Sequence, residues 1–78
     1  MTEQQAQLAK KHLQALDLKS GASYSAVKQK YRLLSRVWHP DRFKGQDELV
    51  QEALLKQRQL NAAYEWLTKN QNILGSPE

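Results

Sequence analysis

Cysteine is absent from this 78-residue chain, and only three glycines and two prolines are present. Without cysteine the chain can form neither a disulfide nor a thiolate metal site. No apolar run approaches the roughly 20 residues that a membrane-spanning helix needs, and the N-terminus does not resemble a signal peptide. We therefore expect a cytoplasmic protein with no membrane segment.

β-Branched residues are also scarce, which bears on the fold class. The chain has six of them, against twelve Leu, eight Ala and ten Gln. This balance favours helix over sheet, because unbranched side chains lose little freedom in a helix whereas branched ones suit strands. The length allows one small domain with a modest core. The sequence therefore predicts an all-α domain.

The first predicted helix begins at a capping signal. Thr2 and Gln5 have the spacing of a capping box, in which each side chain satisfies a backbone amide near the helix start. Apolar or half-apolar residues then recur at helical spacing. They are Leu8, Ala9, His12, Leu13 and Leu16. Because the pattern stops before Gly21, we expect a helix over residues 3–16.

A second helix is predicted after Ser23, which is a suitable N-cap. Its apolar stripe steps by four, three and four residues. The members are Val27, Tyr31, Leu34 and Trp38. The helix must end near Trp38, because Pro40 disfavours the helical conformation for His39 and has no amide to donate. Residues 39–46 should then form a loop closed by Gly45.

The third predicted helix runs from Asp47, taken as its cap, to about Lys69. Its apolar side consists of Val50, Ala53, Leu60, Tyr64 and Leu67. Gln57 interrupts this stripe, and Trp66 is expected to lie away from it as an exposed aromatic. We expect a domain over residues 1–69, followed at residues 70–78 by a flexible tail or linker stub.

Basic charge is concentrated between Lys19 and Lys44. This segment holds seven basic residues and one acid, a net +6, whereas the rest of the chain carries −2. Lys28, Arg32 and Arg36 follow one another at i+4 steps, so they share one face of the second helix, away from its apolar stripe. Such a row is either a solvated helix face or a surface that steers an acidic partner.

The loop carries His39-Pro40-Asp41 directly after the second helix, followed by Arg42. As a purely structural feature, His39 and Asp41 would satisfy local backbone groups at the helix end. Metal binding is not expected, because the only histidines, His12 and His39, lack a metal-ligand spacing. No nucleophile–base pair or Gly-rich phosphate loop is present, so we expect neither an enzyme nor a cofactor.

Taken together, these residues resemble the J-domain family, the DnaJ-type co-chaperones of heat-shock protein 70 (DnaK-type) chaperones. The similarity lies in Val27-Lys28-x-x-Tyr31-Arg32-x-Leu34, in Trp38-His39-Pro40-Asp41-Arg42, and in Leu60-Asn61-Ala62-Ala63-Tyr64-Glu65-Trp66-Leu67. The resemblance implies an antiparallel hairpin of the second and third helices, a packed N-terminal helix and the His-Pro-Asp loop at the hairpin tip. A fourth helix, which the family usually has, is not evident.

The resemblance also implies a function: binding to a heat-shock protein 70 chaperone and stimulation of its ATP hydrolysis, as a monomer that does no chemistry itself. The essential loop would be His39, Pro40 and Asp41, with Asp41 offering its carboxylate to an arginine of the chaperone. Lys28, Arg32 and Arg42 would be the electrostatic contacts, and Tyr31 would be shared between the core and the surface. Arg36, the third cation of the row, is included among the candidate binding residues.

The chain departs from the family pattern at several positions. Leu33 and Val37 stand where basic residues are usual, whereas Arg36 stands where an apolar residue is more common. The basic face is therefore rotated around the second helix. Gln57 replaces a frequent Phe, and Asp17 falls where the family usually has Gly. A buried amide at residue 57 needs a hydrogen-bond partner.

Two alternatives remain open from the sequence. The first is a nucleic-acid-binding helical domain that lays the row Lys28, Arg32 and Arg36 along phosphates. The loop disfavours it, because about eight residues including an acid connect the helices, whereas a helix-turn-helix uses three or four. The second is a purely structural three-helix domain in which Asp41 has no function.

Overall fold

The computed structural model describes residues 2–74, which contain three α-helices and no β-strand. The elements in chain order are α1 (Glu3–Ala15), α2 (Tyr24–Val37), the 3-10 turn η1 (Pro40–Phe43), α3 (Asp47–Lys69) and the 3-10 turn η2 (Gln71–Ile73). The predicted all-α class is therefore confirmed, and each predicted helix is present within a few residues of its expected bounds.

Both predicted caps at the starts of α1 and α2 form. The Thr2 hydroxyl accepts from the amide of Gln5 at 3.1 Å, and the Gln5 side chain accepts from the amide of Thr2 at 3.0 Å. At α2 the Ser23 hydroxyl accepts from the amide of Ala26 at 3.2 Å. These bonds satisfy amides that have no partner inside the helix, which fixes where each helix begins.

The expected cap of α3 is wrong by one residue. Gln46 is the capping residue and its side chain makes no capping hydrogen bond, whereas Asp47 is already the first residue of the helix. There its negative charge lies at the positive end of the helix dipole, which stabilises the helix without a hydrogen bond. Gly45, just before it, has φ +85°, a left-handed conformation that glycine adopts without strain.

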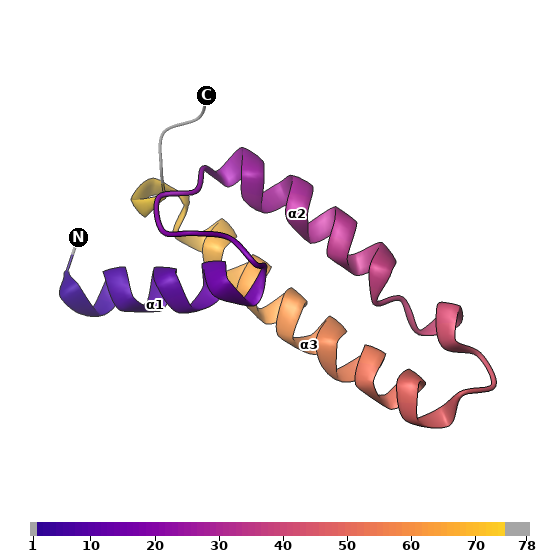
Figure 1. The fold of residues 1–78 in the computed structure, drawn as a ribbon. Coiled ribbons are helices and arrows are strands. Elements are labelled where there is room, and N and C mark those ends of the chain that lie inside the picture. The colour runs from indigo at the N-terminus through magenta and orange to yellow at the C-terminus, as the bar shows by residue number, and fades with distance from the viewer. Residues whose placement is uncertain (1, 75–78) are drawn as a thin grey trace.

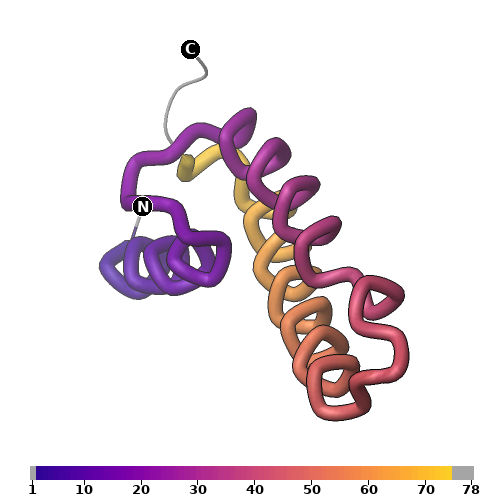
Figure 2. The backbone as a smooth tube through the Cα atoms, turned by 45° about the vertical axis from the view of Figure 1, so that its right-hand side comes forward, coloured from indigo at the N-terminus to yellow at the C-terminus, as the bar shows by residue number. Residues whose placement is uncertain are grey.

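Helices α2 and α3 lie side by side and run in opposite directions (Figure 1). Four hydrogen bonds join the two helices along the seam. Tyr24 bonds to both Thr68 and Tyr64, the Tyr31 hydroxyl to Asn61, and the Gln57 side chain to the backbone oxygen of Ser35. Residue numbers rise along α2 and fall along α3 in matched steps, which is the register of an antiparallel hairpin. Figure 2 shows the same pairing from a second direction.

Helix α1 packs against α3 at the end of the hairpin that is far from η1 (Figure 1). The core gathers there, and its members come from all three helices. They are Leu13, Leu16, Val27, Leu60, Ala63 and Leu67. Nearer to η1 the small residue Ala53 is buried. The end of the hairpin that contacts α1 therefore buries more apolar surface than the end next to η1.

Two expectations at the C-terminal end are wrong. Trp66 is half-buried and stacks on the ring of His12 from α1, with ring centroids 4.8 Å apart, so α1 covers it. The chain does not become a tail at residue 70. The Asn70 side chain donates to the Trp66 carbonyl at 2.8 Å, and Leu74 packs against the core after η2. The remaining tail residues, 75–78, lie outside the described residues.

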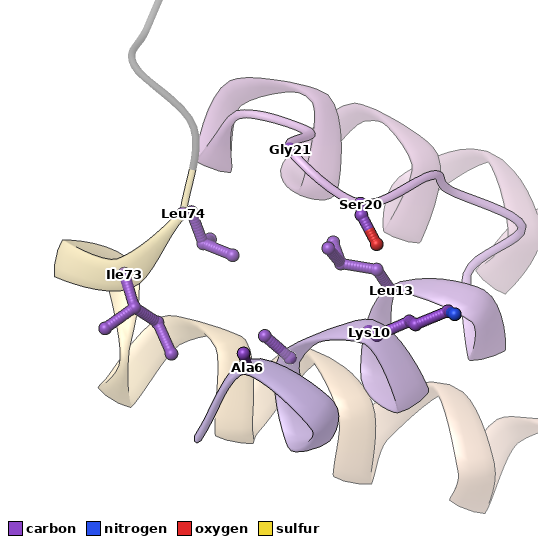
Figure 3. A pocket seen from close by; sticks show the side chains of 8 residues that line it. Ala6, Lys10, Leu13, Ser20, Gly21, Ile73 and Leu74 are labelled. Carbon is purple, nitrogen blue, oxygen red and sulfur yellow. The ribbon is translucent and has the colours of Figure 1, made fainter. Parts of the chain in front are cut away.

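The residues after α3 also form one wall of a hollow between η2, α1 and the loop at residues 20–21 (Figure 3). Its volume is about 290 Å³, and Ile73 and Leu74 face Ala6 and Leu13 across it. Its lining is mainly aliphatic, with Lys10 as the charged side chain. The hollow therefore presents no group of side chains that could carry out chemistry.

Candidate functional site

The connection between α2 and α3 is an ordered turn. Pro40 is the first residue of η1, where a missing amide costs nothing. His39 caps the turn: its Nδ1 atom accepts from the amide of Asp41 at 3.3 Å, and its carbonyl accepts from the amide of Arg42 at 3.0 Å. The sequence His-Pro-Asp thus folds into a turn that is held by its own backbone and by the His39 ring.

His39 and Asp41 differ in what they do locally. The His39 ring satisfies a backbone amide, as the structural alternative expects. The Asp41 carboxylate accepts no hydrogen bond from residues 2–74, and its side chain is 80% exposed. Its Oδ2 atom lies 3.8 Å from His39 Nδ1. That nitrogen is the atom that accepts from the Asp41 amide, and at 3.8 Å it lies beyond hydrogen-bond distance of the carboxylate. Asp41 is therefore available to an external partner.

The predicted basic row lies on the surface of α2. Lys28, Arg32 and Arg36 are all exposed, and so is Arg42 in η1. In the part of the chain that the structure describes, none of these four cations forms an ion pair with a carboxylate. Their charge is thus free to act on a partner, although exposed charges of this kind are strongly screened by salt.

Tyr31 connects the core to this surface. Its ring stacks on Tyr64 with centroids 4.1 Å apart and planes 4° apart, and its hydroxyl donates to Asn61 Oδ1 at 2.5 Å. The ring is half-buried, which agrees with the expectation that Tyr31 is shared between core and surface. Fixing both the ring and the hydroxyl leaves the side chain little freedom to move.

The sequence did not reveal a second set of hydroxyl contacts at the far end of the seam. The Tyr24 hydroxyl lies 2.9 Å from Thr68 Oγ1 and 3.3 Å from the Tyr64 hydroxyl. The hydrogen bond with Thr68 lowers the pKa of Tyr24 below its ordinary value. Aromatic residues at matched positions of two antiparallel helices are the signal that would have predicted this cluster.

A groove of about 730 Å³ lies between α2 and α3, next to η1. It is lined by Tyr31, Arg32, Ser35, Arg36, His39, Gln57 and Asn61. The groove brings together four of the eight predicted site residues, whereas Lys28, Pro40, Asp41 and Arg42 lie outside its lining. Ser35, Gln57 and Asn61 were not predicted as site residues, because polar side chains on two separate helices give no joint signal in the sequence.

Leu33 and Val37, the departures on α2, are exposed at 45% and 40% of their surface. Over residues 2–74 no three His, Asp or Glu side chains gather in a way that could hold a metal ion. None of the helices formed by these residues is long and apolar enough to cross a membrane.

The family model of the DnaJ domain matches residues 11–73, which is most of the chain. The chain belongs to the DnaJ domain family. The predicted J-domain family is thereby confirmed, and the matched range extends through η2, beyond the predicted domain end at residue 69. No solved structure matches the chain significantly.

Proposed function

We propose that this J-domain binds a heat-shock protein 70 (DnaK-type) chaperone and stimulates its ATP hydrolysis. The observation that carries the proposal is the exposed Asp41 carboxylate, held in an ordered turn beside exposed cations of α2 and η1. A carboxylate with no internal partner is well suited to receive an arginine, because a charged pair of this kind is strong and directional.

In this proposal His39 and Pro40 hold the turn and Asp41 makes the decisive contact. Lys28, Tyr31, Arg32, Arg36 and Arg42 form the surrounding surface, which steers and orients an acidic partner. The J-domain does no chemistry itself, needs no cofactor, and acts as a monomer in the cytoplasm. The hydrolysed bond and the catalytic groups belong to the chaperone.

The test is steady-state ATP hydrolysis by a purified DnaK-type chaperone, with and without the chain. We expect stimulation by the wild type, and its loss in Asp41→Asn and His39→Gln. Glu52→Gln is the matched control for Asp41→Asn, because it removes the same charge from an exposed acid of α3. Helical circular dichroism should be unchanged in all three variants, since these side chains are exposed.

If Asp41→Asn stimulates as well as the wild type, the loop does not trigger hydrolysis and the proposal is wrong. Failure of the wild type to stimulate any DnaK-type chaperone would have the same consequence.

A further inference from the structure

The hollow between α1, the turn at residues 20–21 and η2 lies at the end of the hairpin that is far from η1 (Figure 3). Its volume of about 290 Å³ lies near the lower limit of the range in which small molecules bind, roughly 300 to 1,000 Å³. The hollow is thus separate from Asp41 and from the groove between α2 and α3, and its size suits a small molecule.

Small side chains on α1 leave this space open. Ala6 and Ala9 line the hollow where longer side chains would extend toward Ile73 and Leu74 of the opposite wall. Ala9 and Leu13 are buried, whereas Ala6 is exposed, so the buried pair forms the floor and Ala6 lies at the rim. An apolar group that enters the hollow therefore exchanges water for an aliphatic surface, which is favourable.

The walls of the hollow are held in place by hydrogen bonds. The Asn70 side chain donates to the Trp66 carbonyl at 2.8 Å, which fixes the start of η2 to the end of α3. The turn on the other wall is closed by the Ala22 amide, which donates to the Lys19 carbonyl at 3.2 Å. Because the walls are formed before any ligand arrives, the entropy cost of binding is lowered.

The hollow has one apolar side and one polar side. Ile73 and Leu74 line the apolar side, and Lys10 and Ser20 lie opposite them (Figure 3). Lys10 is the one charged residue of the lining, and no carboxylate of residues 2–74 lies within ion-pair distance of it. The Ser20 hydroxyl can donate a hydrogen bond to an anion beside it. A ligand that fits both sides therefore has an aliphatic part and a negative charge at its end.

The surroundings of the hollow favour a small ligand over a protein. A stable protein interface buries about 1,000 Å² or more in total. Apart from alanine, however, the exposed residues of α1 are polar. They are Glu3, Gln4, Gln7, Lys10, Lys11 and Gln14. The apolar surface at this end of α1 is therefore confined to the hollow itself.

We propose that the hollow binds a free fatty acid of medium chain length. The alkyl chain lies over Ala9 and Leu13, and the carboxylate lies beside the Lys10 ammonium group and the Ser20 hydroxyl. The ligand is bound without reaction, because the lining has no group that could carry out chemistry. The site goes beyond the proposed function and does not depend on it, since Asp41 lies at the other end of the hairpin.

The first test titrates the isotope-labelled chain with octanoate and, separately, with octanol, and follows the methyl groups by NMR. We expect saturable shifts at Ala6, Ile73 and Leu74, with octanoate bound about threefold more tightly than octanol. Butyrate should bind at least about tenfold more weakly than octanoate, because fewer methylenes are buried. Equal shifts at Leu33 and Val37, which are exposed and lie outside the hollow, would indicate nonspecific partition and overturn the proposal.

The variant Ala6→Leu tests the apolar side. Leucine is nearly as favourable in a helix as alanine, so the helical circular dichroism should be unchanged. The larger side chain occupies the space at the rim, and we expect octanoate binding to weaken at least about tenfold. Unchanged octanoate binding would place the ligand elsewhere and overturn the proposal.

The variant Lys10→Met tests the polar side, because it keeps the aliphatic stem and removes the charge. We expect octanoate binding to weaken about threefold and octanol binding to stay the same. Lys11→Met is the matched control, since it removes the same charge from the neighbouring residue, which does not line the hollow. Equal losses in the two variants would show that only net charge matters, which contradicts a contact with Lys10.

Two further comparisons identify the ligand class and separate this proposal from the proposed function. Tighter binding of a short peptide that carries leucine next to glutamate would assign the hollow to a protein and overturn the proposal. The titrations contain no chaperone. If octanoate binds in the hollow while the wild type stimulates no chaperone, the proposed function is wrong and the fatty-acid site stands.

Discussion

Gln57 is expected to stabilise the loop-proximal half of the hairpin through one hydrogen bond. The amides of Trp38 and His39 donate to the carbonyls of Leu34 and Arg36, so the Ser35 carbonyl receives no backbone amide at the end of α2. Gln57 of α3 donates to it instead at 2.8 Å. The side chain thus caps one helix from another, just before the His39 turn.

The contribution of this hydrogen bond to stability can be measured by replacing Gln57 with Met. This substitution keeps the length and the apolar stem of the side chain but removes the hydrogen-bond donor. A typical hydrogen bond contributes about 0.5 to 1.5 kcal/mol, and a buried acceptor left without a partner costs about 1 to 3 kcal/mol. Gln57 and Ser35 are half-buried, so water compensates part of the loss. We expect Gln57→Met to lower the free energy of unfolding by about 1 to 2 kcal/mol, and the melting temperature by about 4 to 16 °C.

Thermal unfolding followed by helical circular dichroism measures this change. Gln59→Met is the matched control, because it makes the same substitution at an exposed position of the same helix and should stay within about 0.5 kcal/mol of the wild type. Equal stabilities of Gln57→Met and the wild type would refute the argument. They would mean that the Ser35 carbonyl is satisfied equally well by water.

Two further predictions concern α1 and the turn after it. Burial of His12 and the nearby charge of Lys11 lower the pKa of His12 below 6.5, so the folded state binds fewer protons than the unfolded state. Stability should be fully present above about pH 6.5 and fall as the pH drops through the lowered pKa, and His12→Gln should flatten this dependence in urea unfolding measured between about pH 8 and 5.5. Asp17 has φ +57°, so Asp17→Gly should raise the stability by about 0.5 to 1 kcal/mol, and a lower melting temperature would show that the Asp17 side chain is itself stabilising.

Most of the fold was predictable because it depends on local signals. The caps at Thr2 and Ser23 and the break at Pro40 each act within a few residues, so the sequence placed α1 and α2 correctly. The errors at Trp66 and after residue 69 have a common cause. Both involve segments far apart in the sequence: Trp66 is covered by His12, and Leu74 packs on a core that includes α1 residues. Helical periodicity carries no information about such contacts.

The candidate site was predictable in part for the same reason. The His39–Asp41 turn and the cationic row on α2 come from single segments, and the sequence showed both. The groove needs α2 and α3 to lie in one particular register, so the sequence did not show that Ser35, Gln57 and Asn61 line it. The partner that the Gln57 amide was expected to need is the Ser35 carbonyl. The sequence also showed that Asp17 falls where the family usually has glycine. In the structure this residue has a left-handed backbone conformation, which glycine adopts most easily.

The distribution of burial separates the part of the molecule that holds the fold from the part that presents the loop. The core lies where α1 meets the hairpin, whereas fewer apolar side chains are buried near η1. The contacts there include buried Ala53, the tilted pair of Trp38 and Phe43, Lys56 above the Trp38 ring, and the bond from Gln57. Because stability comes mainly from buried apolar area, changes near η1 should leave the fold intact more often than changes in the core. These contacts near η1 nevertheless set the orientation of Asp41 and of the groove relative to a partner. Surface substitutions in this half of the hairpin should therefore alter chaperone stimulation before they alter the melting temperature.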